Sequence, residues 1–79
     1  MKSLYVVIYR SRDMEKSEIE ASFDKEGLRR FIKNLEKAPY SATLSDIMEV
    51  HIDNSMNLET AENRLNAYYN LYKTIPNNL

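Results

Sequence analysis

The chain has 79 residues, with 11 basic and 12 acidic side chains and a formal net charge of −1, so it has no overall attraction to nucleic acid or anionic lipid. This length predicts one small domain, in which roughly 60 % of the unfolded surface becomes buried. The single glycine excludes the glycine-rich loops that hold phosphates in P-loop and dinucleotide-binding proteins, and the absence of cysteine excludes disulfides.

The first predicted element is a strand over residues 3–10, and it is apolar on both faces. Successive side chains of a strand point to opposite faces of the sheet. One face carries Leu4, Val6 and Ile8, and the other carries Tyr5, Val7 and Tyr9. We expect the helices of so short a chain to cover only one face, which leaves the second for solvent or for a partner.

A second strand and a helix follow. Residues 18–23 alternate between apolar and polar side chains, as a strand with one buried face does. Asp24 is a suitable N-cap for the helix, and Phe23 and Leu28 have the spacing of a hydrophobic staple. Pro39 ends the helix, because the residue before a proline avoids the helical region. The apolar stripe of this helix contains Leu28, Phe31, Ile32 and Leu35.

Residues 45–52 predict a third strand, and Asn57 is the expected N-cap of a second helix. Pro76 terminates this helix, and we expect the last three residues, 77–79, to fray. The apolar stripe contains Leu58, Ala61, Leu65, Tyr68, Tyr69 and Tyr72. The three tyrosines are expected at the edge of the core, with a second contact surface as the alternative, and the sequence leaves their burial open.

Together these elements predict an α+β fold with the order β-β-α-β-α. The sheet is three-stranded and mostly antiparallel, with strand order 2-1-3, and both helices are expected on one face. The open face has an apolar centre and a rim of glutamates, Glu18, Glu20 and Glu49, which is typical of protein interfaces. A symmetric homodimer is the commonest arrangement for such a face. The residues predicted to mediate self-association are Tyr5, Val7, Tyr9 and Ile47.

The first helix carries a basic stripe, which we interpret as a binding face for an acidic protein partner. The stripe contains Arg29, Arg30, Lys33 and Lys37. A nucleic-acid backbone is the alternative ligand, and an ordinary solvated helix face has the same composition. Binding of RNA to the sheet itself is disfavoured, because the three glutamates beside the tyrosines repel phosphates.

Metal and catalytic sites are poorly supported. Glu49, His51 and Asp53 share one side of the third strand, but strand spacing puts neighbours ~6–7 Å apart, and no further histidine or cysteine completes a metal site. His51 is the only histidine, and no serine lies in a glycine-flanked turn, so we expect no Ser–His catalytic pair. A small metal-independent ribonuclease toxin using Arg, Lys and Tyr is a further alternative, against which the neutral overall charge argues. We expect neither an enzyme nor a cofactor.

The expected location is the cytoplasm. No segment approaches the ~20 consecutive apolar residues that span a bilayer, and the first residues lack the cleavage site of a secretion signal. The lack of cysteine is typical of a reducing compartment.

In its small size, its lysine- and asparagine-rich composition and its lack of catalytic parts, the chain resembles the accessory proteins of phages and mobile elements. That resemblance implies a stoichiometric inhibitor, for example of a host defence system. The sequence therefore predicts a non-enzymatic, homodimeric protein-binding module. A nucleic-acid-binding regulator that uses the basic face of the first helix is the alternative of another class.

Overall fold

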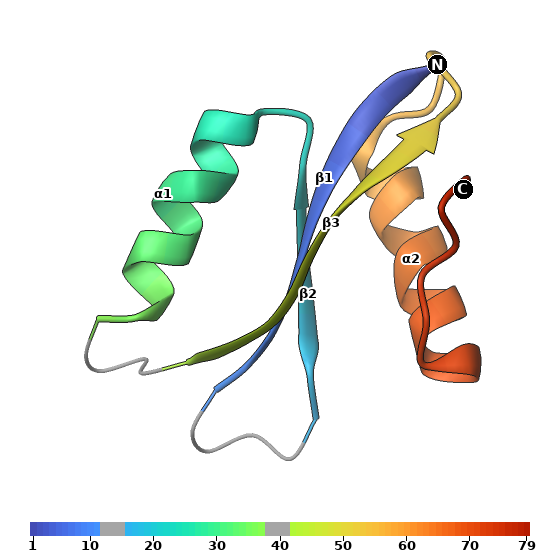
Figure 1. Cartoon of the computed structure of the whole chain (residues 1–79). Helices are drawn as coiled ribbons and strands as arrows, with labels where there is room; N and C mark the ends of the chain where they lie inside the picture. The colour runs from blue at the N-terminus through green and yellow to red at the C-terminus, as the bar shows by residue number, and fades with distance from the viewer. Residues whose placement is uncertain (12–15, 38–41) are drawn as a thin grey trace.

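The computed structural model describes residues 1–11, 16–37 and 42–79. The chain folds in the predicted order β-β-α-β-α, and the α+β class is confirmed (Figure 1). The elements are β1 (Lys2–Arg10), β2 (Glu18–Ser22), α1 (Lys25–Leu35), β3 (Thr43–Ile52) and α2 (Leu58–Tyr72). Helix α1 ends at Leu35, earlier than the predicted end at Pro39, which itself lies outside the described residues. Neither helix of the described ranges is long and apolar enough to cross a membrane.

The sheet has the predicted order β2-β1-β3, and β1 pairs antiparallel with both neighbours. Val7 lies opposite Glu20 of β2 and Ile47 of β3, which fixes the register on each side. The ladder between β1 and β3 shifts by one residue at Ile8 and Tyr9, so that Ser45 is the extra residue of a β-bulge. Both β2 and β3 are edge strands, and β3 is the longer.

The two helices pack on opposite faces of the sheet, which corrects the expectation that both cover one face (Figure 1). Leu65 of α2 belongs to one core cluster, and Leu28 and Leu35 of α1 belong to the other. The first cluster includes Leu4, Val6 and Ile8 of β1, whereas the second includes Val7. A strand that is apolar on both faces is thus explained by burial on both faces, with one amphipathic helix covering each.

The helix starts follow their predicted caps. The Asp24 carboxylate accepts a hydrogen bond from the Glu26 amide at 3.1 Å, and the Asn57 side chain accepts one from the Thr60 amide at 2.8 Å. These bonds satisfy amides that the first helical turn leaves without partners. The predicted staple is absent, because Phe23 packs into the core cluster on the α2 face while Leu28 packs under α1.

The end of α2 and the C-terminal segment differ from expectation. Helix α2 ends at Tyr72 rather than near Pro76, because Lys73 adopts a left-handed conformation (φ 55°) and donates its amide to the Tyr69 carbonyl at 2.8 Å. The last residues are paired rather than frayed. The His51 amide donates to the Asn77 carbonyl at 3.3 Å, and the Leu79 amide donates to the His51 carbonyl at 3.1 Å.

Candidate protein-binding surfaces

The structure does not bring the four predicted self-association residues together as an open face. Val7 is fully buried beneath α1, where it contacts the cluster of Leu28 and Leu35. Tyr9 is half-buried, with its ring edge-on to Phe31 at a centroid distance of 5.4 Å. Tyr5 is also half-buried. The assignment of Val7 to an exposed interface is therefore wrong, because α1 covers this part of the sheet.

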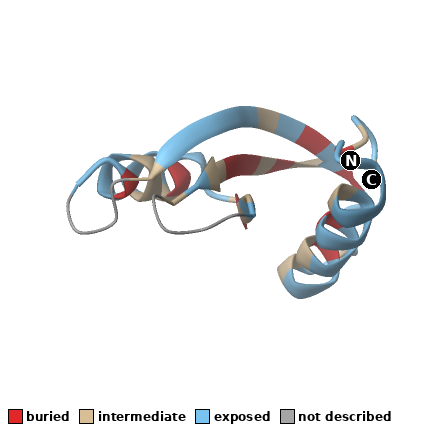
Figure 2. Cartoon of the chain, turned by 90° about the horizontal axis from the view of Figure 1, so that it is seen from below, coloured by how far each residue is buried: buried red, intermediate tan, exposed pale blue. Residues whose placement is uncertain are grey.

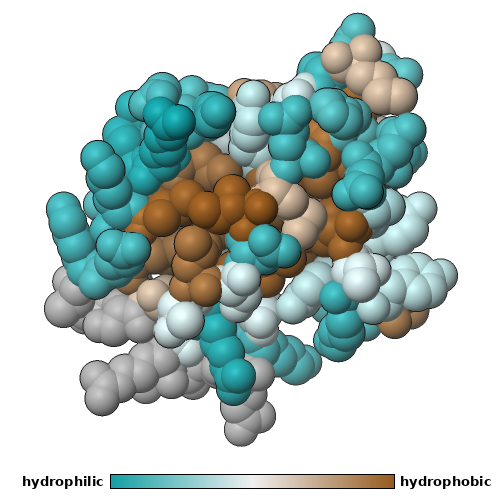
Figure 3. All heavy atoms as spheres, in the orientation of Figure 1, coloured by the Kyte–Doolittle hydropathy of each residue, from teal (hydrophilic) through white to brown (hydrophobic). Residues whose placement is uncertain are grey.

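What remains exposed on that face belongs to β3. Helix α1 packs against β1 and β2, and the first half of β3 extends beyond it, exposed along its length (Figure 2). Two apolar side chains stand here, Ile47 with 51 % exposure and Leu44 with 39 %. They lie opposite Val7 and Tyr9 on the neighbouring strand. We call Leu44 and Ile47 the β3 surface; Figure 3 shows a contiguous apolar area between α1 and β3, bordered by hydrophilic side chains over α1.

A polar cluster occupies the other end of β3. The Ser3 hydroxyl donates to Glu49 Oε2 at 3.0 Å, and His51 Nε2 lies 3.8 Å from the same oxygen. Asp53, the third member of the metal-ligand pattern, lies just beyond the end of β3. Its carboxylate accepts hydrogen bonds from the Ser55 hydroxyl at 2.6 Å and the Ser55 amide at 2.8 Å, which lower the pKa of Asp53. Across residues 1–11, 16–37 and 42–79, the structure forms no group of three potential metal ligands.

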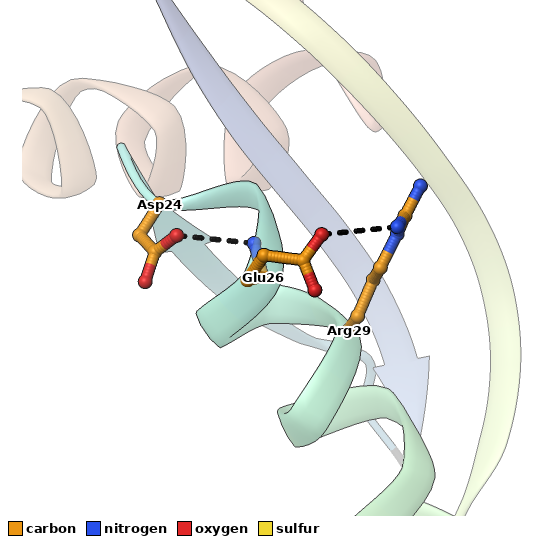
Figure 4. Close-up of polar contacts among 3 residues, drawn as sticks. All are labelled: Asp24, Glu26 and Arg29. Atoms are coloured by element: carbon orange, nitrogen blue, oxygen red, sulfur yellow. Dashed lines mark hydrogen bonds and ion pairs between the residues drawn. The ribbon is translucent and has the colours of Figure 1, made fainter.

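The residues of the predicted basic stripe are all exposed, but Lys37 lies beyond the end of α1 at Leu35, so only Arg29, Arg30 and Lys33 belong to the helix. The four residues also differ in what they contact. Arg29 pairs with Glu26 at 3.0 Å, and Arg30 lies 3.9 Å from Asp24 (Figure 4 shows Asp24, Glu26 and Arg29). Such exposed pairs contribute about 1 kcal/mol or less. The ammonium groups of Lys33 and Lys37 form no ion pair within the part of the chain that the structure describes. They are therefore the members of the stripe best placed to meet an acidic partner.

Negative charge gathers on the opposite edge of the same sheet face. Burial, followed by the charges of Glu18 and Glu20, raises the pKa of Tyr9. Burial, followed by the charge of Glu62, raises the pKa of Glu20. The glutamates predicted to stand beside the sheet tyrosines thus do so at β2, and this edge of the domain suits phosphate poorly.

The second exposed apolar patch lies on α2. Its side chains are Tyr68 (42 % exposed), Leu71 (75 %) and Tyr72 (64 %), and the two tyrosine rings lie 6.1 Å apart. Tyr69, in contrast, is half-buried and packs against the core. The burial that the sequence left open is thereby resolved: one tyrosine of three faces the sheet. We call Tyr68, Leu71 and Tyr72 the α2 surface.

A depression of about 410 Å³ lies at the start of α2. Three of its polar side chains are already engaged in the fold, because Asp53 binds Ser55 and Asn57 caps the helix. The Ser55 hydroxyl does contact the Asp53 carboxylate, but the lowered pKa of Asp53 makes this carboxylate a weak base, and no histidine lines the depression. The residues that line it are Asp53, Ser55, Met56, Asn57, Thr60 and Arg64.

Comparison with other proteins identifies no relative: the chain matches no protein-family model, no curated protein and no solved structure.

Proposed function

We propose that this chain is a non-enzymatic protein-binding module that acts by occupying the surface of a protein partner. The observation that carries this proposal is the β3 surface, where Ile47 is half exposed opposite Val7, the residue that the cationic helix α1 covers. An apolar centre with a charged border is the composition of protein interfaces. Large exposed apolar patches on small domains commonly mark such contact sites.

The charges around this surface favour an acidic partner. Lys33 of α1 and Lys37, just beyond the end of this helix, form no ion pair among the described residues, so both ammonium groups can meet a carboxylate of the partner. Complementary charge mainly speeds association and selects the partner, while apolar contact supplies most of the affinity. Arg29 and Arg30 contribute less, because Glu26 and Asp24 already lie beside them.

The biological setting follows from size and composition. A single domain of 79 residues without a catalytic constellation is suited to stoichiometric inhibition, in which one copy blocks one partner. This is the mode of action that the resemblance to phage and mobile-element accessory proteins implies, and a cytoplasmic setting belongs to the same proposal. Self-association through the sheet is also part of this proposal, with β3 instead of β1 as the strand that makes the contact.

A second candidate function, binding to a nucleic-acid backbone through the basic stripe, is favoured by one observation: within residues 1–11, 16–37 and 42–79, the ammonium groups of Lys33 and Lys37 form no ion pair. Phosphate contacts weaken steeply as salt rises, whereas an interface with an apolar centre depends less on salt. Binding to random DNA or RNA at 50 mM salt that vanishes at 200 mM salt would favour this second function.

Affinity capture tests the proposed function. The wild-type chain is immobilised, exposed to an extract of its native cells, and the retained proteins are identified by mass spectrometry. Lys33→Glu is the test variant, and Arg64→Glu on α2 is the matched control, because both change the charge by −2 at exposed positions. We expect one acidic protein to be retained by the wild type and the control and lost with Lys33→Glu. Equal retention by all three would contradict the assignment of α1.

A further inference from the structure

The outer edge of β3 presents backbone hydrogen-bonding groups that the sheet does not use. In an antiparallel ladder, alternate residues direct both their amide and carbonyl groups to the same neighbour. His51 directs both groups outward, to the C-terminal segment. Ile47 and Glu49 share its parity without an intervening bulge, so their amide and carbonyl groups also point to the outer edge.

Only parts of this edge are covered. The C-terminal segment, residues 77–79, binds at His51. At Ile47, the amide donates to the side chain of the preceding residue, Asp46, at 2.8 Å. The outward groups of Glu49 receive no hydrogen bond from the residues that the structure describes. An uncovered edge strand of this kind is a template for pairing with another strand.

We propose that this edge pairs antiparallel with β3 of a second copy of the chain, with the two Ile47 residues facing each other across the two-fold axis. The proposal rests on the proposed function, and it names the partner and the register for the self-association included there. Pairing of this kind would join two three-stranded sheets into one of six strands, in the order 2-1-3-3-1-2.

The register of the two paired β3 strands is determined by their charged side chains and by the C-terminal segment that already covers part of the β3 edge. An axis at Asp46 or at Glu49 places like charges directly opposite each other, which destabilises a strand pair. An axis at Met48 places Ser45 opposite His51, whose backbone groups are occupied by the C-terminal segment. An axis at Ser45 places the bulge in the centre of the ladder.

An axis at Ile47 avoids the like-charge pairs, keeps the bulge out of the centre, and lets residues 45–49 pair before Thr43 would reach His51. It pairs residues 45–49 with their copies, sets the exposed Ile47 side chains against each other and places Ser45 opposite Glu49. The two-fold axis is then perpendicular to the sheet, so both α1 helices lie on the same side. Asp46 restrains the pairing, because its carboxylate competes for the Ile47 amide. This competition keeps the association reversible, as edge-strand charges do elsewhere.

Cysteine cross-linking tests the register directly, because the chain has no cysteine of its own. Opposed residues of a hydrogen-bonded antiparallel pair have Cα atoms about 5.5 Å apart, within the range that a disulfide spans. The single variants Ile47→Cys, Met48→Cys and Leu71→Cys are each oxidised at equal concentration, and dimer formation is followed by non-reducing electrophoresis. Leu71→Cys is the control for random collision, since Leu71 is 75 % exposed on α2.

We expect Ile47→Cys to cross-link about tenfold faster than Leu71→Cys, because pairing raises the effective concentration of its thiol. Asp46→Ala should strengthen dimerisation severalfold by releasing the Ile47 amide. Equal rates for all three variants, or fastest cross-linking of Met48→Cys, would overturn the proposal. If Ile47→Cys does not cross-link faster than the control while the capture of an acidic protein still depends on Lys33, only the pairing of two copies is refuted. Cross-linking at Ile47 without any captured partner would instead contradict the proposed function.

Discussion

The burial of Val7 provides a quantitative test of the two-sided core. Val7→Ala removes the equivalent of two methyl groups from a side chain with no exposed surface. At ~0.8 kcal/mol per buried carbon, the transfer cost is about 1.6 kcal/mol, and the cavity left under α1 raises the loss to about 2–3 kcal/mol. A domain of this length has a free energy of unfolding of about 4–12 kcal/mol, so the loss is a large fraction of the total.

The assay is urea unfolding followed by far-ultraviolet circular dichroism, with Leu71→Ala as the control. Leu71 is 75 % exposed, so its truncation should change the free energy of unfolding by about 0.5 kcal/mol or less. Val7→Ala should lower the thermal midpoint by roughly 10–20 °C. If Val7→Ala and Leu71→Ala behave alike, Val7 is not covered by α1, and the placement of the two helices on opposite faces is refuted.

Three further predictions concern local interactions. Asn57→Ala removes the cap of α2 and should lower the free energy of unfolding by about 0.5–2 kcal/mol in the same urea assay; an unchanged midpoint would contradict the cap. The pKa of Glu20 is raised in the folded state, so the stability it contributes is present below its ordinary value of 4.5 and is lost as the pH rises through the folded pKa. Glu20→Gln should therefore raise the urea midpoint at pH 7 and lose this advantage below pH 4.5. The pKa of Asp53 is lowered, so its contribution is present above its ordinary value of 3.8 and is lost as the pH falls through the folded pKa. Ser55→Ala should therefore lower the urea midpoint at pH 7 and have little effect in strong acid, and an equal effect at both pH values would contradict the hydrogen bond.

The local features of the fold could be predicted because neighbouring residues determine them. Asp24 and Asn57 cap their helices as their side-chain chemistry requires, and the stripe beginning at Leu28 is the buried face of α1. The strand order could also be predicted, since a strand that is apolar on both faces belongs in the centre of a sheet. These inferences depend on short-range geometry, which the sequence pattern specifies.

The placement of the helices could not be predicted in the same way. The pattern of β1 is compatible with an open face for a partner or with burial on both faces, and only the packing of α1 over Val7 decides between them. For this reason the structure places the candidate site at Ile47 on the edge of the sheet, whereas the sequence predicted it at the centre. The contact between Asp46 and the Ile47 amide depends on side-chain placement, which strand alternation alone does not reveal.

Sedimentation equilibrium tests the central claim, that the β3 edge is an interaction surface, most directly. The wild type is compared with Ile47→Asp and with Leu71→Asp, which places the same charge at an exposed leucine on α2. We expect a reversible monomer–dimer equilibrium for the wild type and for Leu71→Asp, and a monomer for Ile47→Asp, with all three equally folded by circular dichroism. A wild type that stays monomeric at millimolar concentration, or a dimer disrupted by Leu71→Asp and not by Ile47→Asp, would contradict the account.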